Sequence, residues 1–403
     1  MVINSELNKK ELSYCRNVSG QLFVDVSVLI HVNDGSGIQR VVMNILHCLL
    51  LSPPKGMMVY PVYRKNGAYW YSEKFILERE VPVDQPIVKK EGRIQVSKGD
   101  VFLGLDFDHR IDARAQYFLK RQQKKYGLRV YFVVYDLIAV THPNWFNTNF
   151  SKIVKSWLHK IVIIADGLIC ISQTVAIDLN KYLLEQRNRV DVHVGFFHLG
   201  AEISTLLQDD STNNDENCLI QWFQKQLVFL MVGTLEPRKG HEQVLRAMTH
   251  LWQDEQEILL VIVGKKGWNV EQLVQSINYH PDNGTHLFWF ENVSDAFLQR
   301  LYSVSSVLLM ASEGEGFGLP LVEAARNGLP IIARDLPVFR EVAGNKAFYF
   351  SSYDAKGLAD ELLHWLHLYR MNMHPLSSGL RWLTWEESAE SLVRVFLDER
   401  WIK

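Results

Sequence analysis

The sequence predicts an α/β protein made of two doubly wound, Rossmann-like domains that face a central cleft. Short apolar runs, rich in β-branched and aromatic residues, alternate along the chain with segments of helical periodicity. Runs that are apolar throughout are typical of parallel strands covered by helices on both faces. A pattern of strand, glycine-containing loop and amphipathic helix starts at residue 21 and again at residue 227. These two similar openings indicate two domains of the same construction.

Six strands are expected in each half of the chain. In the first half they cover residues 21–30, 58–64, 100–105, 128–134, 167–172 and 192–198. In the second half they cover residues 227–233, 258–264, 286–290, 306–310, 329–333 and 347–350. Between the first two strands of the second half, apolar residues recur at helical spacing, namely Val244, Met248, Leu251 and Trp252. They form one apolar stripe that can pack on a sheet.

The expected domain limits lie where the composition changes between the two sets of strands. Residues 206–218 are polar and acidic without periodicity, which predicts a linker or an exposed loop. We therefore expect an N-terminal domain over residues 1–205 and a C-terminal domain over residues 219–384. In open parallel sheets, ligands bind at the carboxyl ends of the strands, so the loops that follow strands are the places to search for a site.

The composition excludes several classes of protein. The 403 residues are 47% apolar, and 43 basic against 45 acidic side chains give a net charge of −2. A protein that neutralises many nucleic-acid phosphates is normally more basic than this. The four cysteines form no Cys-x-x-Cys pair. Because no apolar run reaches the length of a signal peptide core or the roughly 18 residues of a membrane span, we expect a cytoplasmic protein.

The segment 312–333, SEGEGFGLPLVEAARNGLPIIA, carries the strongest signal for a site. Its glycines predict a loop, Pro320 suits the first turn of a helix, and Gly328 suits the end of that helix. The N-terminus of such a helix presents free N–H groups and a positive dipole end to an anion. Glu315 in the loop and Glu323 in the helix can accept hydrogen bonds from sugar hydroxyls. Together these features favour a ligand that combines phosphate with sugars over an ordinary connection with two solvated glutamates.

Two adjacent cations follow the first strand of the second half, in VGTLEPRKG (232–240). Arg238 can clamp two phosphate oxygens, and Lys239 supplies a compact charge. A solvated basic turn is the ordinary alternative, but the expected position in the cleft favours a phosphate site. In the first half, the loop DGSGIQR (34–40) places Gly37 where backbone can approach a ligand. A tight turn explains that glycine equally well, and the loop lacks the G-x-G-x-x-G fingerprint.

Two further loops of the first half hold polar candidates. Asp136 and His142 follow a strand at its carboxyl end, and a lone histidine is more often structural, which favours Asp136. Asp106 and Asp108 form an Asp-x-Asp, a pattern that can hold a metal bound to a nucleotide diphosphate. No third ligand is placed beside them, and the basic pair of the second half already supplies countercharge. We therefore expect a structural role for both aspartates and no metal site.

Basic stretches with aromatic residues occur within residues 118–160, in FLKRQQKKYGLR (118–129) and SKIVKSWLHK (151–160). Runs of this kind are usually solvated helix faces. Because they are confined to one half of the chain, they could also hold that half against an anionic membrane.

Three segments, GTLEPRKG, VSDAFLQRLYSVSSVLLMAS and EGEGFGLPLVEAARNGLP, together resemble the family 4 retaining glycosyltransferases of the GT-B fold. The likeness runs from about residue 21 to 395 and is strongest over 227–345. In the first half, DGSGIQRVVMNIL, VYDLIAVTHP and CISQTVAIDL are similar to the mannosyltransferase-type branch that builds bacterial O-antigen and related polysaccharides.

The resemblance implies a role for each candidate. Arg238 and Lys239 match the pair that binds the donor diphosphate and balances the charge of the leaving group. Glu315 matches the glutamate that contacts the transferred sugar, and Glu323 the one that holds the nucleotide ribose. The resemblance also implies that the first domain binds the acceptor, that the second binds the nucleotide-sugar donor, and that residues 385–403 form a helix on the first domain. The other expected site residues are Gly37, Gly316, Phe317, Gly318 and Leu319 beside the donor and Asp136 at the catalytic centre.

Two positions depart from the family pattern. Thr234 stands where many members have arginine, which leaves phosphate binding to Arg238 and Lys239. Tyr135 stands where many members have histidine, so Asp136 is the remaining polar candidate of its loop.

The implied reaction transfers a hexose, above all mannose from GDP-mannose, to a saccharide hydroxyl with retention at the anomeric carbon. No metal or cofactor is expected, and the expected acceptor is a lipid-linked saccharide at the inner face of the cytoplasmic membrane. Two alternatives stay open. One is a sugar-nucleotide epimerase of GT-B fold, and the other is a non-catalytic sugar-nucleotide-binding partner of a polysaccharide assembly complex.

Overall fold

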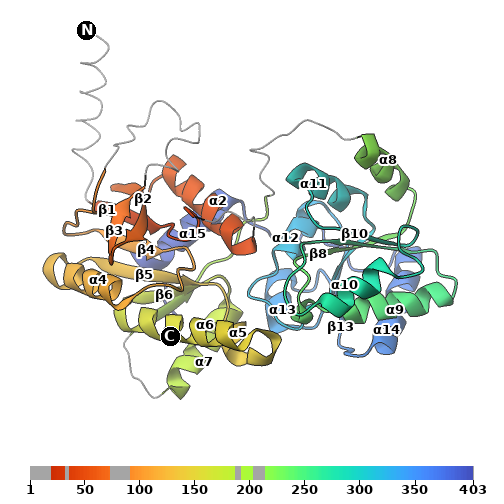
Figure 1. Ribbon diagram of the computed structural model, residues 1–403. Helices are drawn as coiled ribbons and strands as arrows, with labels where there is room; N and C mark the ends of the chain where they lie inside the picture. Colours follow the sequence, from red (N-terminus) through yellow and green to blue (C-terminus); the bar gives the residue numbers. More distant parts are fainter. Residues whose placement is uncertain (1–19, 32–35, 73–90, 187–191, 203–213, 403) are drawn as a thin grey trace, which may run out of the picture. The chain divides into compact units, whose positions relative to one another are not determined.

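A computed structural model describes residues 20–31, 36–72, 91–186, 192–202 and 214–402. The chain folds into two compact units (Figure 1). The first comprises residues 1–143, 147–199 and 385–403, and the second comprises residues 144–146 and 200–384. Each unit is a layered α/β domain around its own sheet, which confirms the predicted fold class at the level of the single domains.

The first unit is built on a seven-stranded sheet of order β3-β2-β1-β4-β5-β6-β7. Neighbouring strands are parallel except for the antiparallel pair of β2 and β3. The strands are β1 (Gly20–Asp25), β2 (Met57–Lys65), β3 (Ala68–Tyr71), β4 (Val101–Gly104), β5 (Arg129–Val134), β6 (Gly167–Cys170) and β7 (His193–Phe196). Its helices are α2 (Gly37–Leu51), α4 (Ala113–Tyr126), α5 (Ile138–Thr141), α6 (Thr148–Ile164), α7 (Gln173–Glu185) and α15 (Trp385–Leu397).

The second unit is built on a six-stranded, parallel sheet of order β10-β9-β8-β11-β12-β13. Its strands are β8 (Val228–Val232), β9 (Leu259–Val263), β10 (Leu287–Phe290), β11 (Val307–Met310), β12 (Ile331–Arg334) and β13 (Phe348–Phe350). Its helices are α8 (Asn214–Phe223), α9 (His241–Gln253), α10 (Glu271–Asn278), α11 (Asp295–Val304), α12 (Leu319–Arg326), α13 (Pro337–Ala343) and α14 (Ala355–Arg370). The strand order reverses between β8 and β11, which makes this pair the topological switch point of the sheet.

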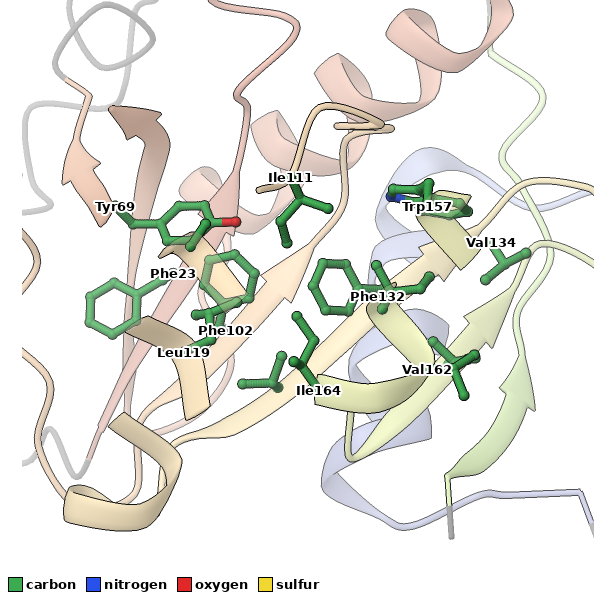
Figure 2. Packing of buried hydrophobic residues seen from close by; sticks show 14 of the residues in the cluster. Phe23, Tyr69, Phe102, Ile111, Leu119, Phe132, Val134, Trp157, Val162 and Ile164 are labelled. Atoms are coloured by element: carbon green, nitrogen blue, oxygen red, sulfur yellow. The ribbon is translucent and has the colours of Figure 1, made fainter. Parts of the chain in front are cut away.

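Aromatic side chains of neighbouring strands build the core of the first unit (Figure 2). The ring of Phe102 on β4 lies 4.6 Å from that of Tyr69 on β3 and 5.9 Å from that of Phe132 on β5. Leu119 of α4 and Trp157 of α6 belong to the same buried cluster. In the second unit, α9 buries the predicted apolar stripe against its sheet.

The C-terminal helix α15 packs on α2, β6 and β7 of the first unit. Phe396 stacks on Tyr131 of β5 with ring centroids 5.1 Å apart, and Trp401 stacks on the same ring at 5.7 Å. Gly195 on β7 allows this approach, because a Cβ there would lie 2.5 Å from a methyl carbon of Val395. The C-terminal residues are therefore part of the first core, although the whole second unit precedes them in the chain.

Two features of the first sheet differ from the sequence prediction. The strand expected over 21–30 ends at Asp25, because the carboxylates of Asp25 and Asp106 accept the backbone N–H groups that follow and turn the chain. Strand β3 was not expected. Asn66 and Gly67 both have positive φ, 51° and 72°, and form the tight turn that pairs β3 with β2.

The prediction of a linker or exposed loop over residues 206–218 is wrong in part. Residues 206–213 lie outside the described residues, and 214–218 form the first half of α8. Asp215 and Glu216 lie in the first turn, where negative charge is favourable, and Ile220 and Phe223 are buried. Polar composition concealed a short amphipathic helix. Among the described helices, none is both long and apolar enough to cross a bilayer.

Candidate active site

The candidate site lies at the switch point of the second sheet. Strands β8 and β11 pair in parallel, with Leu308 opposite Leu230. Because parallel neighbours end at the same edge, the loop after β8 (233–240) and the loop after β11 (311–318) start side by side. The two loops carry the predicted basic pair and the first predicted glutamate, respectively. The sheet topology thus brings together two motifs that are far apart in sequence.

The two loops are fixed to each other by close backbone contact. Gly240 has a positive φ of 73°, and a Cβ there would lie 2.4 Å from the carbonyl oxygen of Ala311. Two residues away along each loop, the N–H of Glu313 donates to the carbonyl of Arg238 at 2.8 Å. A side chain at position 240 would force the loops apart. Glycine is therefore required where the basic turn meets the second loop.

The predicted glycine loop and helix are confirmed. Gly318 has a positive φ of 94° and precedes α12, whose first turn contains Pro320. The helix ends at Arg326, and Gly328 follows in a left-handed conformation with φ 67°. Gly316, Phe317 and Leu319 lie in or directly after this loop, where their backbone groups adjoin the helix N-terminus.

Glu315 forms ion pairs with both cations of the basic turn. Its Oε1 accepts from Lys239 Nζ at 2.5 Å and from the Ser312 hydroxyl at 2.7 Å, and its Oε2 accepts from Arg238 Nη1 at 3.2 Å. Arg238 also donates to the Gly314 carbonyl at 2.7 Å, and its Nε lies 2.9 Å from Glu236 Oε2. We call Glu236, Arg238, Lys239, Ser312 and Glu315 the Glu315 cluster.

The charges of the Glu315 cluster are held in a largely buried position. The exposed fraction of the Glu315 side chain is 9%, against 13% for Arg238 and 16% for Lys239. Burial raises the pKa of Glu315, but the charges of Lys239 and Arg238 and the hydrogen bonds from Lys239 and Ser312 outweigh it, so the pKa falls to about 2. Burial and the neighbouring Lys239 lower the pKa of His241 to about 3. At neutral pH Glu315 is therefore ionised and His241 is neutral.

Glu323 lies one helical turn into α12 and points into the domain. Its side chain is 1% exposed, and its Oε2 accepts a hydrogen bond of 2.7 Å from the Tyr302 hydroxyl. The structure therefore places the two predicted glutamates in different surroundings, one among cations and the other against a tyrosine of α11. The ribose contact expected for Glu323 stays a prediction.

The remaining candidates belong to the first unit. Gly37 is the first residue of α2, and Ser36 caps that helix through the N–H of Gln39. Asp136 follows β5 and accepts the N–H of Ile138 at 3.0 Å. His142 is exposed, ends α5 and lies 2.9 Å through Nδ1 from the Thr141 hydroxyl. Each of these positions adjoins a helix terminus, and the roles predicted for Gly37 and Asp136 stay predictions.

Asp106 and Asp108 are buried, and their carboxylates accept hydrogen bonds from other groups of the protein. Asp106 Oδ2 accepts the N–H groups of Val28 and Leu29, both at 2.7 Å. Asp108 pairs with Arg64, whose Nε donates at 2.6 Å. Both carboxylates therefore have the structural role that the sequence favoured. In the described part of the chain, no group of three or more potential ligands that could hold a metal is found.

Arg334, at the end of β12, was missed by sequence reasoning. The residue is 1% exposed, and its guanidinium donates to the Ala311 carbonyl, to the Ser352 carbonyl at 2.9 Å and to Gln243 Oε1 at 2.5 Å. It thereby ties the start of the glycine loop to α9 and to the loop after β13. A charged residue directly after an apolar strand is a weak signal for this role, because such residues are usually exposed.

Comparison with known proteins finds a family match within the second unit and sequence similarity over most of the chain. Residues 220–376 match the family model of the glycosyl transferases group 1. The serotype-specific mannosyltransferase WbdA of Escherichia coli is 38% identical over 382 residues, which cover 93% of this chain and 46% of that protein. The O-antigen chain mannosyltransferase RfbU of Salmonella typhimurium is 33% identical over 162 residues, 40% of this chain and 43% of that one. The chain thus spans about half the length of these curated relatives.

Two solved structures share the fold. Sucrose-phosphate synthase from Thermosynechococcus elongatus aligns with a TM-score of 0.61 at 16% identity, over 94% of this chain and 99% of that one. Anabaena Alr3699/HepE in complex with UDP-glucose aligns with a TM-score of 0.58 at 14% identity, over 94% and 95%. Together with the strand order of the sheets, these likenesses confirm the predicted GT-B fold.

Acid is expected to weaken the fold through Glu315. The folded-state pKa of about 2 lies below the ordinary value of 4.5, so this carboxylate stabilises the protein above about pH 4.5 and loses that contribution as the pH falls toward 2. A shift of this size corresponds to about 3 kcal/mol. The advantage in unfolding free energy of wild type over Glu315→Gln should therefore shrink by up to about 3 kcal/mol between about pH 5 and pH 2. Denaturant unfolding measured along this pH series would contradict the ion pairs if the difference stayed constant.

Proposed function

Because residues 220–376 form a group 1 glycosyl transferase domain, we propose that the chain is a retaining mannosyltransferase that moves mannose from GDP-mannose to a saccharide hydroxyl. The observation that carries this proposal is the Glu315 cluster, which places Arg238 and Lys239 at the switch point, in contact with the loop that leads into α12. The identity to mannosyltransferases over most of the chain supports the choice of sugar.

The basic turn and the helix N-terminus are suited to the donor diphosphate. The planar guanidinium of Arg238 can bind two phosphate oxygens, and Lys239 supplies a compact charge beside it. The free N–H groups at the start of α12 add the positive end of a helix dipole. These groups are positioned before the donor arrives, so they can stabilise the negative charge that grows on the leaving diphosphate.

The proposed reaction keeps the configuration of the anomeric carbon. The bond from this carbon to the phosphate oxygen breaks, and the acceptor hydroxyl oxygen bonds to the same face of the sugar. The hydroxyl proton passes to the departing phosphate oxygen, which therefore serves as the base. Glu315 and the N–H groups of Gly316, Phe317 and Gly318 hold the transferred sugar, Leu319 lines the donor site, and Glu323 serves the ribose.

We propose that the reaction needs no metal and no cofactor. The two cations of the Glu315 cluster and the α12 N-terminus supply the positive charge that a divalent ion provides in other transferases. Asp106 and Asp108 are engaged by backbone N–H groups and by Arg64, which supports a structural role rather than metal binding.

We further propose that helices α4 and α6 face the anionic membrane that carries a lipid-linked acceptor, at the cytoplasmic side. The two helices pack on each other, and neither contains an aspartate or a glutamate. Tyr117 is 69% exposed and Ile153 40% exposed. The exposed basic side chains of these helices are Arg114, Lys120, Arg121, Lys124, Lys125, Lys152 and Lys155. Basic side chains interleaved with exposed apolar ones suit a surface of anionic headgroups.

Replacement of Lys239 by alanine should cripple turnover. Loss of one preorganised charge at a leaving group costs about a hundredfold in rate. The measurement is transfer from GDP-mannose to a saccharide acceptor at saturating donor, with the anomeric configuration of the product determined by NMR. Lys356→Ala, an exposed lysine of the same domain, is the matched control and should keep wild-type turnover. An inverted product, or altered sugar nucleotide formed from donor alone, would contradict the proposal in favour of inverting or epimerase chemistry.

Chelation should leave the rate unchanged. Because the diphosphate charge is balanced by side chains and backbone, EDTA in excess is expected to change the initial rate by less than about twofold. Loss of activity in EDTA that manganese restores would overturn the proposal, and Asp106 and Asp108 would then be tested as ligands by substitution with asparagine.

Charge reversal on α6 should release the protein from anionic vesicles. Each lysine near such a surface contributes about 1 kcal/mol, so Lys152→Glu with Lys155→Glu should weaken binding to phosphatidylglycerol vesicles by at least about tenfold. Co-sedimentation measures the bound fraction, with phosphatidylcholine vesicles and Lys356→Glu as controls. Equal binding of wild type and double variant would show that this face does not meet the membrane.

A further inference from the structure

The carboxylate of Glu315 forms ion pairs with the same two cations, Arg238 and Lys239, that are proposed to bind the diphosphate. We propose that Glu315 is an internal counter-ion which a sugar-bearing diphosphate displaces more readily than free diphosphate does, so that it determines specificity for a donor over free diphosphate and promotes release of the product. This inference rests on the proposed function, because it assigns the same site to a nucleotide sugar.

The first step is the charge balance of the Glu315 cluster. Lys239 Nζ and Arg238 Nη1 donate to different oxygens of Glu315, and Arg238 Nε faces Glu236. Two cations are thus matched by two carboxylates within one largely buried group of side chains. A diphosphate that enters this neutral cluster must compete with a carboxylate for each cation. Its binding therefore includes the cost of breaking the ion pairs of Glu315.

The second step is the fate of the displaced carboxylate. Glu315 is 9% exposed, so an oxygen that leaves Lys239 or Arg238 does not enter bulk water. A buried charge without donors costs far more than a satisfied one. The Ser312 hydroxyl serves one oxygen at 2.7 Å, and the other must find a new donor. Inorganic diphosphate offers at most the one acidic P–OH that it keeps near neutral pH, whereas a hexose on the diphosphate carries several hydroxyls.

The third step links this exchange to catalysis. When a nucleotide sugar binds, the sugar hydroxyls can satisfy Glu315 while the phosphates take the cations. After transfer, the hexose leaves with the acceptor, and Glu315 loses those donors. Its return to Lys239 and Arg238 then competes with the nucleoside diphosphate that remains. The same side chain thereby favours the donor on entry and disfavours the product on exit.

The inference predicts that a substitution within the binding site strengthens the affinity for diphosphate, whereas such substitutions usually weaken binding. If Glu315 only touched the sugar, its replacement would leave the affinity for diphosphate unchanged. If it is a counter-ion, Glu315→Gln frees the cations and tightens that affinity. Hydrogen bonds between charged partners are strong enough that a gain of about tenfold or more is expected for inorganic pyrophosphate and for GDP. The preference for GDP-mannose over pyrophosphate should shrink by a similar factor.

Calorimetric titration of the full chain with pyrophosphate, GDP and GDP-mannose tests this directly. Glu313→Gln is the matched control, because it removes a carboxylate of the same loop that, in the described part of the chain, forms no ion pair with Lys239 or Arg238. We expect the control to bind pyrophosphate within about twofold to threefold of wild type, the size of a remote charge effect. Melting temperatures of both variants verify that they are folded.

A second measurement tests whether free sugar and pyrophosphate bind cooperatively. If sugar hydroxyls relieve the cost of displacing Glu315, free mannose at high concentration should raise the affinity for pyrophosphate, and this coupling should vanish in Glu315→Gln. Unchanged or weaker pyrophosphate affinity in Glu315→Gln, or no coupling to mannose in wild type, would overturn the inference while leaving the proposed function intact. Failure of wild type to bind GDP and GDP-mannose would instead overturn the proposed function.

Discussion

The parallel pairing of β8 with β11 is the constraint on which the candidate site depends. It places two loops at one edge of the second sheet, and Gly240 lets the backbone of one loop touch the Ala311 carbonyl of the other. Arg334 donates two hydrogen bonds to the same carbonyl and ties it to α9 through Gln243. The charged side chains are therefore carried by backbone that is fixed on several sides, which suits a site that must be organised before its ligand arrives.

A consequence of this rigidity is that the site must satisfy its own charges when it holds no ligand. Cations that are aimed at a diphosphate and shielded from water are costly unless a counter-ion accompanies them. Glu315 meets this requirement, and its pKa of about 2 keeps it ionised in the folded protein near neutral pH. In the proposed function, anion binding at this site is thus an exchange of partners rather than the filling of a vacant positive pocket.

The sequence was sufficient for the parts of the fold that depend on local pattern. The apolar runs predicted twelve strands of the two sheets, and Pro320 and Gly328 marked the limits of α12 to within a residue or two. Strand β3 was missed, although Asn66-Gly67 is a recognised hairpin signal, because its four residues follow β2 too closely to stand out as a separate run. Helix α8 was missed because its exposed face is acidic.

The site was predictable as a set of residues and not as a set of contacts. Arg238, Lys239 and Glu315 each stood out from residue type and position, but their mutual ion pairs join segments 76 and 77 residues apart in sequence. Nor could the sequence show that Arg334 is buried, since its partners are two carbonyls and an amide from three separate elements.

These contacts change the expected role of Glu315. A glutamate taken alone is a hydrogen-bond acceptor for a sugar, whereas a glutamate shared with both cations also sets how strongly those cations bind phosphate. One side chain then responds to both halves of a nucleotide sugar, and the affinity for either half depends on the presence of the other. A transferase has to hold its donor and let go of its product, two ligands that share the same diphosphate. An acidic residue placed between the phosphate and sugar positions distinguishes them by the hexose alone.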